Sequence, residues 1–323
     1  MSGEGGLKRG TVLRALVAVL ILGWGGHSVW EAWNELDRST LKLDPVGLML
    51  AALAGAAGLL SLALTSALGV RAAGLGGAPD FVASWLRVWF TGYFYRYIPG
   101  KVMLVVERAR LGGRLGVPTS TSVILVVWES LLLLAGAGLA GGAGLALGAS
   151  SQANPVSTRM IVLLAATALV GSLLLGPLLV ALSTRWPRLA ARLPGLLFQV
   201  PARAQLLLVG GNMIAWLLLG ASFSLLAASV SPERAPPTGA LLTWFIVSYV
   251  GGQVTSVAPA GLGVREALLI AGLADFVPAP LALAWAVAHR ILLSTVELIL
   301  VLLSQLLPLP NELEPPIPRA PPS

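Results

Sequence analysis

Residues 89–134 read WFTGYFYRYIPGKVMLVVERARLGGRLGVPTSTSVILVVWESLLLL, and residues 249–294 read YVGGQVTSVAPAGLGVREALLIAGLADFVPAPLALAWAVAHRILLS. At this constant offset of 160 residues, matching positions carry the same residues: Gly92 and Gly252, Pro99 and Pro259, Gly112 and Gly272, Val117-Pro118 and Val277-Pro278, Leu132-Leu133 and Leu292-Leu293. Each segment interrupts an apolar stretch with Pro and Gly. Paired broken segments in two halves of a membrane chain indicate a transport site built from discontinuous helices. The sequence therefore predicts an internally duplicated core, as an inverted or pseudo-symmetric repeat.

Composition places the chain in a membrane. Of its residues 56% are apolar and 11% are charged, and its mean hydropathy is +0.85. A soluble domain carries about 25% charged residues, so this chain has too little polar surface for that class. Long continuous apolar runs predict an all-α integral membrane protein, because about 20 apolar residues cross the bilayer as a helix. About seven full spans are expected besides the two broken or re-entrant segments, at residues 11–33, 46–69, 119–148, 158–183, 204–230, 238–258 and 281–307.

The formal net charge of +7 does not indicate a nucleic-acid partner. Basic residues collect beside the hydrophobic spans, within residues 8–14, 101–114 and 185–203. Short basic loops face the cytoplasm under the positive-inside rule. We therefore expect a multi-pass protein of the cell membrane, inner or plasma, with a cytoplasmic N-terminus. Such loops also attract anionic lipid headgroups, so membrane lipids are the expected partners.

Several kinds of chemistry find no support in the residues. The chain has no cysteine and only two histidines, which excludes disulfides, thiolate catalysis and zinc sites built from cysteine. It also lacks the GxxxxGK[ST] pattern of a P-loop ATPase. We therefore expect no cofactor, no metal site and no catalytic residue.

The chain is expected to form one polytopic membrane domain over residues 1–307. Its repeat-like halves cover about residues 46–183 and 204–307. Residues 308–323 read PLPNELEPPIPRAPPS, and this proline-rich composition predicts a disordered tail.

The first broken segment combines aromatic and basic residues. Trp85, Trp89, Tyr93 and Tyr97 recur every four residues, which favours an interfacial aromatic belt along one helix face. Arg87 and Arg96 should face protein, water or an anion, because an arginine facing lipid costs at least about 2.5–3.5 kcal/mol.

Pro99-Gly100 should end this first helix, with Lys101 at the break and a new helix beginning near Val102. Free N–H groups there, together with Lys101 and Arg96, would suit a phosphate. A simple interfacial cap with a snorkelling lysine is an equal alternative.

The second broken segment is similar. Tyr249, Gln253 and Ser256 place a polar stripe on an apolar helix, and Pro259, Gly261 and Gly263 then free the backbone before Arg265-Glu266 opens a short helix. Irregular backbone in a membrane is tolerated only inside protein or beside a wet cavity, and we favour the cavity. Arg265 would meet an anionic headgroup there, or else form a structural pair with Glu266 or Glu129.

Ionisable residues also lie within the following spans. Glu129 in the first copy matches His289-Arg290 in the second, and Arg290 and Glu297 are seven residues apart and share a helix face. Intramembrane charges are functional candidates by default. A purely structural Arg290–Glu297 or Arg290–Glu129 pair is the alternative, and His289 is either a proton carrier or simply a hydrogen-bonded residue.

Two runs resemble a known family. YIPGKVMLVVERARLGGRLGV and PAGLGVREALLIAGL are similar to the two signatures of the lysylphosphatidylglycerol synthase transmembrane region, a flippase-like family. The resemblance covers nearly the whole chain and implies a lipid translocation domain. The positions that match its motifs are Pro99, Gly100, Lys101, Arg108, Pro259, Gly261, Gly263, Arg265, Glu266 and Arg290. The chain departs from the family at Ser130, where an acidic motif usually continues, and at His289, where an aromatic residue is common.

The expected function is translocation of an anionic lipid between leaflets, either a phospholipid or a polyprenyl-phosphate-linked intermediate. The phosphate would rest between Lys101 and Arg265 while the tail stays in lipid. The alternatives are a membrane-embedded lipid-modifying transferase, with Glu129 or Glu266 as general base, and a non-catalytic scaffold for a lipid- or glycan-modifying enzyme. The expected substrate-binding residues are Lys101, Arg265, Arg96, Arg108, Glu129, Tyr249, Gln253, Glu266 and Arg290.

Overall fold

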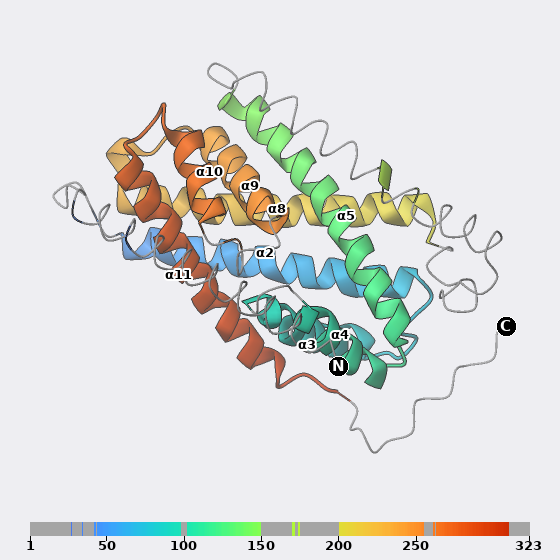
Figure 1. Ribbon diagram of the computed structural model, residues 1–323. Coiled ribbons are helices and arrows are strands. Elements are labelled where there is room, and N and C mark those ends of the chain that lie inside the picture. The colour runs from blue at the N-terminus through green and yellow to red at the C-terminus, as the bar shows by residue number, and fades with distance from the viewer. Residues whose placement is uncertain are drawn as a thin grey trace, which may run out of the picture.

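The computed structural model describes residues 42, 44–97, 102–149, 200–254, 261 and 263–309, together with the isolated positions 27, 34, 170, 171 and 174. Every regular element within these residues is helical, and Figure 1 shows how the helices are arranged. The expected all-α class is therefore confirmed for the part of the chain that the structure describes.

Four of the described helices are long and apolar enough to cross a membrane. They are α2 (Pro45–Ala72), α5 (Thr119–Gly144), α8 (Ala202–Val230) and α11 (Ala279–Ser304), and α5 is extended by a π-helical turn (Leu145–Ala149). Each exceeds the roughly 20 residues that a span needs. The protein is a helical membrane protein, and the four helices match expected spans to within a few residues.

The remaining expected spans are only partly visible. Residues 11–33 and 158–183 lie outside the described residues except at a few positions, as does the tail beyond residue 309. The range expected at 238–258 contains α9 (Thr238–Val254), whose 17 described residues do not place it among the four candidate spans. The count of about seven spans therefore stays a prediction.

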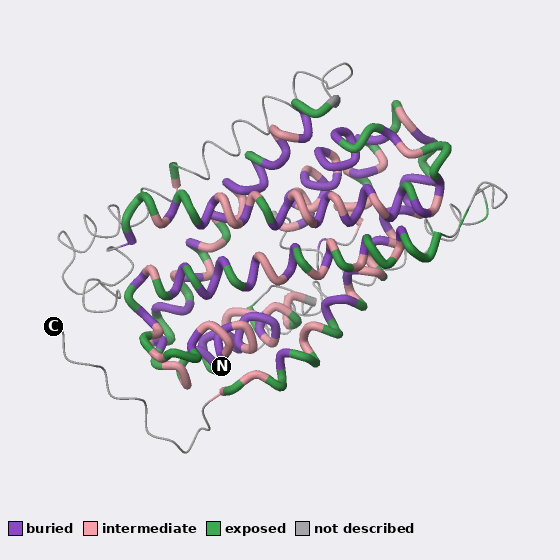
Figure 2. The backbone as a smooth tube through the Cα atoms, turned by 180° about the vertical axis from the view of Figure 1, so that it is seen from behind, coloured by how far each residue is buried: buried purple, intermediate pink, exposed green. Residues whose placement is uncertain are grey.

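Helices α2 and α8 run side by side and antiparallel along the molecule (Figure 1). Their ends are joined where Asp44 N–H donates to the Ser229 carbonyl at 3.2 Å. Close approach depends on glycine, because a Cβ at Gly58 would lie 2.8 Å from Leu219 Cγ. Small residues are what allow transmembrane helices to pack this closely. Figure 2 shows buried and exposed positions alternating along both helices as their turns face inward and outward.

In each broken segment the structure describes a helix before and a helix after residues that lie outside the described part of the chain. In the first, α3 (Phe81–Phe94) and the 3₁₀ turn η2 (Tyr95–Tyr97) precede α4 (Val102–Arg114). In the second, α9 precedes α10 (Val264–Leu273). The predicted helix starts near Val102 and Arg265 are therefore confirmed. Pro99, Gly100, Lys101 and Pro259 lie outside the described residues.

Two glycines fix the entry into α10. Gly261 and Gly263 have φ values of 70° and 82°, which residues with a Cβ rarely adopt. The Gly263 N–H donates to Glu266 Oε2 at 2.8 Å, so the carboxylate satisfies a donor at the helix start.

The long helix after each broken segment begins in the same way. Pro118 and Pro278 are the N-cap residues of α5 and α11, with φ and ψ of −61° and 145°, and of −59° and 145°. The first N–H groups of a helix have no intrahelical acceptor. Proline has no N–H, so at a helix start it costs the helix no hydrogen bond.

The interpretation of the aromatic stripe as an interfacial belt was wrong. Trp85 and Trp89 are 1% and 6% exposed and belong to the hydrophobic core. Helix α3 packs between α2, α4 and α11, so its aromatic face meets protein instead of the membrane surface. A four-residue aromatic spacing identifies one helix face but not what covers that face.

Gly136 on α5 provides a test of this packing. A Cβ there would lie 2.6 Å from Asn212 Cβ and 2.8 Å from the Met213 backbone nitrogen on α8, whereas a Cβ at Gly142 on the same helix meets nothing within 4 Å. We expect Gly136→Ala to lower the free energy of unfolding in detergent by about 1–3 kcal/mol, because the backbone of α8 would have to move away to make room for the added methyl group. Gly142→Ala is the matched control and should leave it unchanged or slightly higher. Equal effects of the two substitutions would contradict this packing.

Candidate functional site

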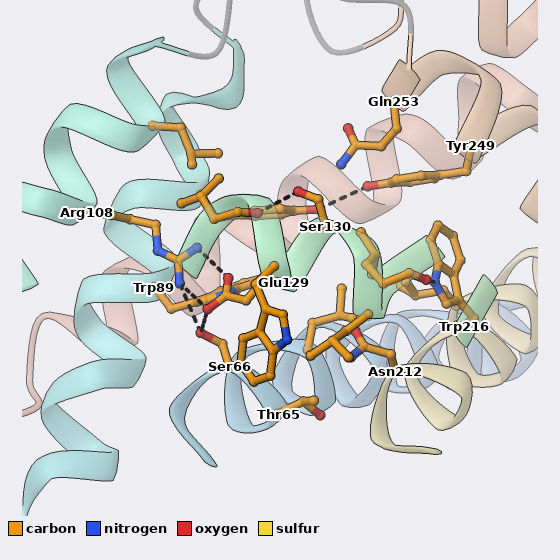
Figure 3. Close-up of a pocket in the computed structure, with 18 residues that line it drawn as sticks. Thr65, Ser66, Trp89, Arg108, Glu129, Ser130, Asn212, Trp216, Tyr249 and Gln253 are labelled. Atoms are coloured by element: carbon orange, nitrogen blue, oxygen red, sulfur yellow. Dashed lines mark hydrogen bonds and ion pairs between the residues drawn. The ribbon is translucent and has the colours of Figure 1, made fainter. Parts of the chain in front are cut away.

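A cavity of about 110 Å³ lies between α2, α3, α4, α5, α8 and α9 (Figure 3). A water needs roughly 10–15 Å³ of such space, so the cavity has room for several waters or a small polar group. Aromatic side chains form much of its wall: Trp89, Tyr93, Trp128, Trp216 and Tyr249. Its polar lining residues are Thr65, Ser66, Arg108, Glu129, Ser130, Asn212 and Gln253.

A buried ion pair closes one side of this cavity. Arg108 on α4 donates to both carboxylate oxygens of Glu129 on α5, at 2.6 and 2.9 Å. Ser66 on α2 donates to Glu129 at 2.7 Å, and it accepts from Arg108 at 3.0 Å and from Trp85 at 2.8 Å. The arginine and carboxylate therefore compensate each other's charge at the wall of the cavity. Gly92 on α3 makes room, since a Cβ there would overlap the Arg108 side chain.

A second ion pair connects the first broken segment to α11. Arg96 donates to Glu297 at 2.6 Å and to the Tyr249 hydroxyl of α9 at 3.1 Å. Tyr93 and Tyr249 share a hydrogen bond of 3.1 Å, so the two broken segments meet at these tyrosines. Arg87 donates to the Leu307 carbonyl at 2.9 Å. Both arginines of α3 and η2 are thus bonded to protein, as expected.

Arg265 of α10 is held differently. Its guanidinium carbon lies 4.3 Å from the centre of the Tyr249 ring and 5.3 Å from that of Phe245. No ion pair joins it to a carboxylate among the described residues. The predicted Arg265–Glu266 and Arg265–Glu129 pairs are therefore not formed. Cation–π contacts orient a guanidinium but leave its charge uncompensated.

Arg290 of α11 also pairs in an unexpected way. It donates to Glu266 of α10 at 2.7 Å, and both side chains are largely buried. The pairs considered from the sequence, Arg290–Glu297 and Arg290–Glu129, were wrong, because Glu297 binds Arg96 and Glu129 binds Arg108. The seven-residue spacing placed Arg290 and Glu297 on one face of α11, but Arg290 binds Glu266 of the neighbouring helix α10 instead.

His289 is buried and hydrogen-bonded. It is 0% exposed, its Nε2 lies 3.1 Å from Ser222 Oγ, and its ring packs edge-on against Phe223 and Phe245. Ser222 donates its hydrogen to the Ala51 carbonyl at 2.7 Å, so His289 Nε2 must carry the proton in their bond. This environment is that of a packed, hydrogen-bonded histidine.

The expected substrate-binding residues gather in two adjoining places. Arg108, Glu129, Tyr249 and Gln253 line the cavity. Tyr249 connects it to the arginine cluster, which we define as Arg96, Arg265, Glu266, Arg290 and Glu297. Lys101 lies outside the described residues, so its place relative to Arg265 stays a prediction.

Sequence reasoning missed the residues that α2 and α8 contribute to the cavity. These are Leu62, Thr65, Ser66, Asn212, Trp216 and Leu219. Single polar residues inside apolar spans were the available signal, but such residues often bond only to their own helix. Only the packing of α2 against α3 and α5 shows that Ser66 binds a carboxylate.

The described helices define a class, that of helical membrane proteins, and short and long helices together line a cavity that contains an arginine–glutamate ion pair. No cluster of histidine, aspartate or glutamate suited to a metal ion occurs within the described part of the chain. Neither a protein-family model nor a curated protein sequence matches the chain.

Helix α4 also carries an ion pair in which the arginine is exposed and the glutamate is buried. Arg110 donates to Glu107 at 2.6 and 2.9 Å, and the Arg110 side chain is 49% exposed. This hydrogen bond lowers the pKa of the Glu107 carboxyl below its ordinary value. A lowered pKa means that the pair stabilises the fold above the ordinary glutamate pKa and that this contribution is lost as pH falls.

The two carboxylates allow a matched comparison. We expect Glu129→Gln to lower the free energy of unfolding in detergent by about 3 kcal/mol or more, because Arg108 would be left buried without its counter-charge. Glu107→Gln removes a carboxylate from the more exposed pair on the neighbouring helix and should cost less than about 1 kcal/mol. Replacing Arg108 and Glu129 together by Met should recover part of the loss. A Glu129→Gln effect no larger than that of Glu107→Gln would contradict the buried pair.

Proposed function

We propose that this chain moves an anionic lipid between membrane leaflets, and that Arg265 holds the lipid phosphate. The single observation that supports this most is the environment of Arg265, which is placed by aromatic rings at the start of α10 and has no carboxylate partner among the described residues. The other ionic side chains around it form pairs.

The arginine cluster has an excess of positive charge. Arg96 is paired with Glu297, and Arg290 is paired with Glu266. The positive charge of Arg265 is therefore the one in the cluster that no carboxylate of the cluster compensates. An uncompensated arginine within a membrane protein is expensive, and such residues usually mark a substrate or ion pathway. A phosphate supplies the missing negative charge and accepts the guanidinium hydrogens in its natural fork geometry.

The order of elements supports an internally duplicated core. In each half a long helix, α2 or α8, precedes a broken pair, α3–α4 or α9–α10, and then a long helix that starts after Val-Pro. Glu129 and His289 occupy the same place at the offset of 160, and each bonds a serine on the first long helix of its half: Ser66 at 2.7 Å and Ser222 at 3.1 Å. We infer that these are matching half-sites.

The two half-sites differ in a way that suggests a transport cycle. Glu129 lines an open cavity, whereas His289 is 0% exposed between aromatic rings. In the proposed cycle the two halves exchange these roles, so that the polar headgroup faces one leaflet and then the other while the tail remains in lipid. Alternating access about repeated halves is a common design of transporters.

This function agrees with what the resemblance to the lysylphosphatidylglycerol synthase transmembrane region implies, and we propose membership of that flippase-like family. The transferase and scaffold alternatives make different predictions. A transferase would form a new lipid product from purified protein and donor, and a scaffold would act only together with its enzyme. Translocation requires neither.

Arg265→Gln tests the proposal. In proteoliposomes with fluorescently labelled phosphatidylglycerol, we expect the wild-type chain to exchange the lipid between leaflets and Arg265→Gln to slow that exchange at least about tenfold, because a charge-assisted hydrogen bond to the phosphate is lost. Adding Lys101→Gln should abolish exchange. Exchange is measured as the fraction of label that a membrane-impermeant quencher reaches over time.

Arg234→Gln is the matched control, since Arg234 is exposed in the turn η5 (Pro232–Arg234) after α8 and its loss changes the net charge equally. It should exchange lipid at the wild-type rate. Wild-type exchange by the folded Lys101→Gln, Arg265→Gln double variant would refute the assignment of the phosphate site.

A further inference from the structure

Three polar side chains of the cavity each donate a hydrogen bond to their own helix. Thr65 Oγ1 donates to the Ser61 carbonyl at 2.7 Å, and Ser130 Oγ donates to the Val126 carbonyl at 2.7 Å. Asn212 Nδ2 donates one of its two hydrogens to the Leu208 carbonyl at 2.9 Å, and its Oδ1 is a hydrogen-bond acceptor. Each of these residues lines the cavity, so each offers it an oxygen that accepts hydrogen bonds.

The charges in the cavity cancel. Arg108 and Glu129 are its ionic lining residues, and they bind each other through two hydrogen bonds. The Glu129 carboxylate also accepts from Ser66. An ammonium group that entered would find no carboxylate without a partner, whereas a neutral group would not need one. The cavity therefore favours a neutral guest that donates hydrogen bonds.

The cavity also adjoins the proposed phosphate site. Tyr249 lines the cavity, and the guanidinium of Arg265 lies over its ring at 4.3 Å. A group attached to a phosphate at Arg265 would therefore lie beside the Tyr249 ring, which is part of the cavity wall. Figure 3 shows Tyr249 and Gln253 on one side of the cavity and Thr65 and Asn212 on the other.

We propose that this cavity binds a neutral, hydroxyl-bearing headgroup, so that the transported lipid is a phosphodiester of a polyol or sugar. This inference rests on the proposed translocation function and adds the substrate class to it. The headgroup hydroxyls donate to Thr65, Ser130 and Asn212, and the surrounding tryptophans and tyrosines cover its apolar C–H faces. Without those hydroxyls, the oxygens of the buried residues Thr65 and Asn212 lose water and gain no partner, which is how a polar site rejects an analogue that lacks a hydroxyl.

Two labelled lipids form a matched pair for the test. Phosphatidylglycerol and phosphatidylpropanol carry the same phosphodiester charge and the same number of headgroup carbons, and only the first has hydroxyls. Proteoliposomes of the full chain should exchange phosphatidylglycerol at least about tenfold faster than phosphatidylpropanol, from the loss of one to two hydrogen bonds. Phosphatidylethanolamine, which carries an ammonium group, should also be slower than phosphatidylglycerol.

Substitutions in the cavity tie the preference to these residues. Thr65→Val and Asn212→Leu should each lower the ratio of the phosphatidylglycerol rate to the phosphatidylpropanol rate by about fivefold, which corresponds to one hydrogen bond. Thr295→Val is the control. Like Thr65, Thr295 donates to the carbonyl four residues earlier, that of Ile291 at 2.9 Å, but it lies on the exposed side of α11. Its ratio should equal that of the wild type. Because Thr65→Val is nearly isosteric, the test does not depend on whether Asn212→Leu folds.

The outcomes separate the two proposals. Equal rates for phosphatidylglycerol and phosphatidylpropanol, or faster exchange of phosphatidylethanolamine, would overturn the headgroup inference while leaving translocation standing. A folded wild-type chain that exchanges none of the three lipids would contradict translocation itself, and the headgroup inference would fall with it. A preference that survives both cavity substitutions would place the selective residues elsewhere and overturn the site.

Discussion

A charged side chain within a membrane protein must find a partner inside the protein, and this constraint fixes the positions of the broken segments. Three buried ion pairs each connect a short element beside a break to a long helix: Arg96 to Glu297, Arg108 to Glu129, and Arg290 to Glu266. Breaking any of them would leave a charge without compensation in a region of low dielectric. The breaks are therefore held by strong, directional interactions and not only by apolar packing. Arg265 is the exception, and the proposed function follows from that exception.

The cavity depends on the same arrangement. Helix α4 is held against α5 by Arg108, and Tyr93 and Tyr249 bring the two broken segments together at its rim. The long antiparallel helices α2 and α8 supply the far wall with Thr65, Ser66 and Asn212. A polar space inside a membrane protein thus arises where short helices end and leave room between long ones. Irregular backbone belongs in such places, because only protein or enclosed water satisfies its polar groups.

Much of the helical layout could be predicted from the sequence, because local signals decide it. Hydropathy located the long helices, and Pro and Gly located the starts of α4 and α10 near Val102 and Arg265. The pairing of charges could not be predicted in the same way. Arg290 lies seven residues before Glu297 on one helix, yet it binds Glu266 because α10 packs against it. Partners of this kind depend on helix packing that no local pattern records.

The candidate site shows the same division. Arg108, Glu129, Tyr249 and Gln253 were expected as binding residues because charges and polar stripes stand out in apolar segments, and all four line the cavity. Asn212 was missed because a single amide in an apolar helix can equally bond to its own backbone, as its Nδ2 does. Its second polar atom matters only because α8 faces the cavity. Trp85 and Trp89 were placed at the membrane surface because spacing alone does not distinguish an interfacial face from a buried one.

Alternating access of the cavity can be measured most directly in a chain with no native cysteine. Asn212→Cys places a thiol in the cavity, and Ile214→Cys places one on the exposed face of the same helix, where Ile214 is 52% exposed. Membrane-impermeant maleimides should label Cys at position 212 from either side of sealed proteoliposomes in separate experiments. They should not label position 214, which lies outside the cavity on an exposed face of an apolar candidate span. Labelling of position 212 from one side only, in folded protein under exchange conditions, would contradict a cavity that serves both leaflets.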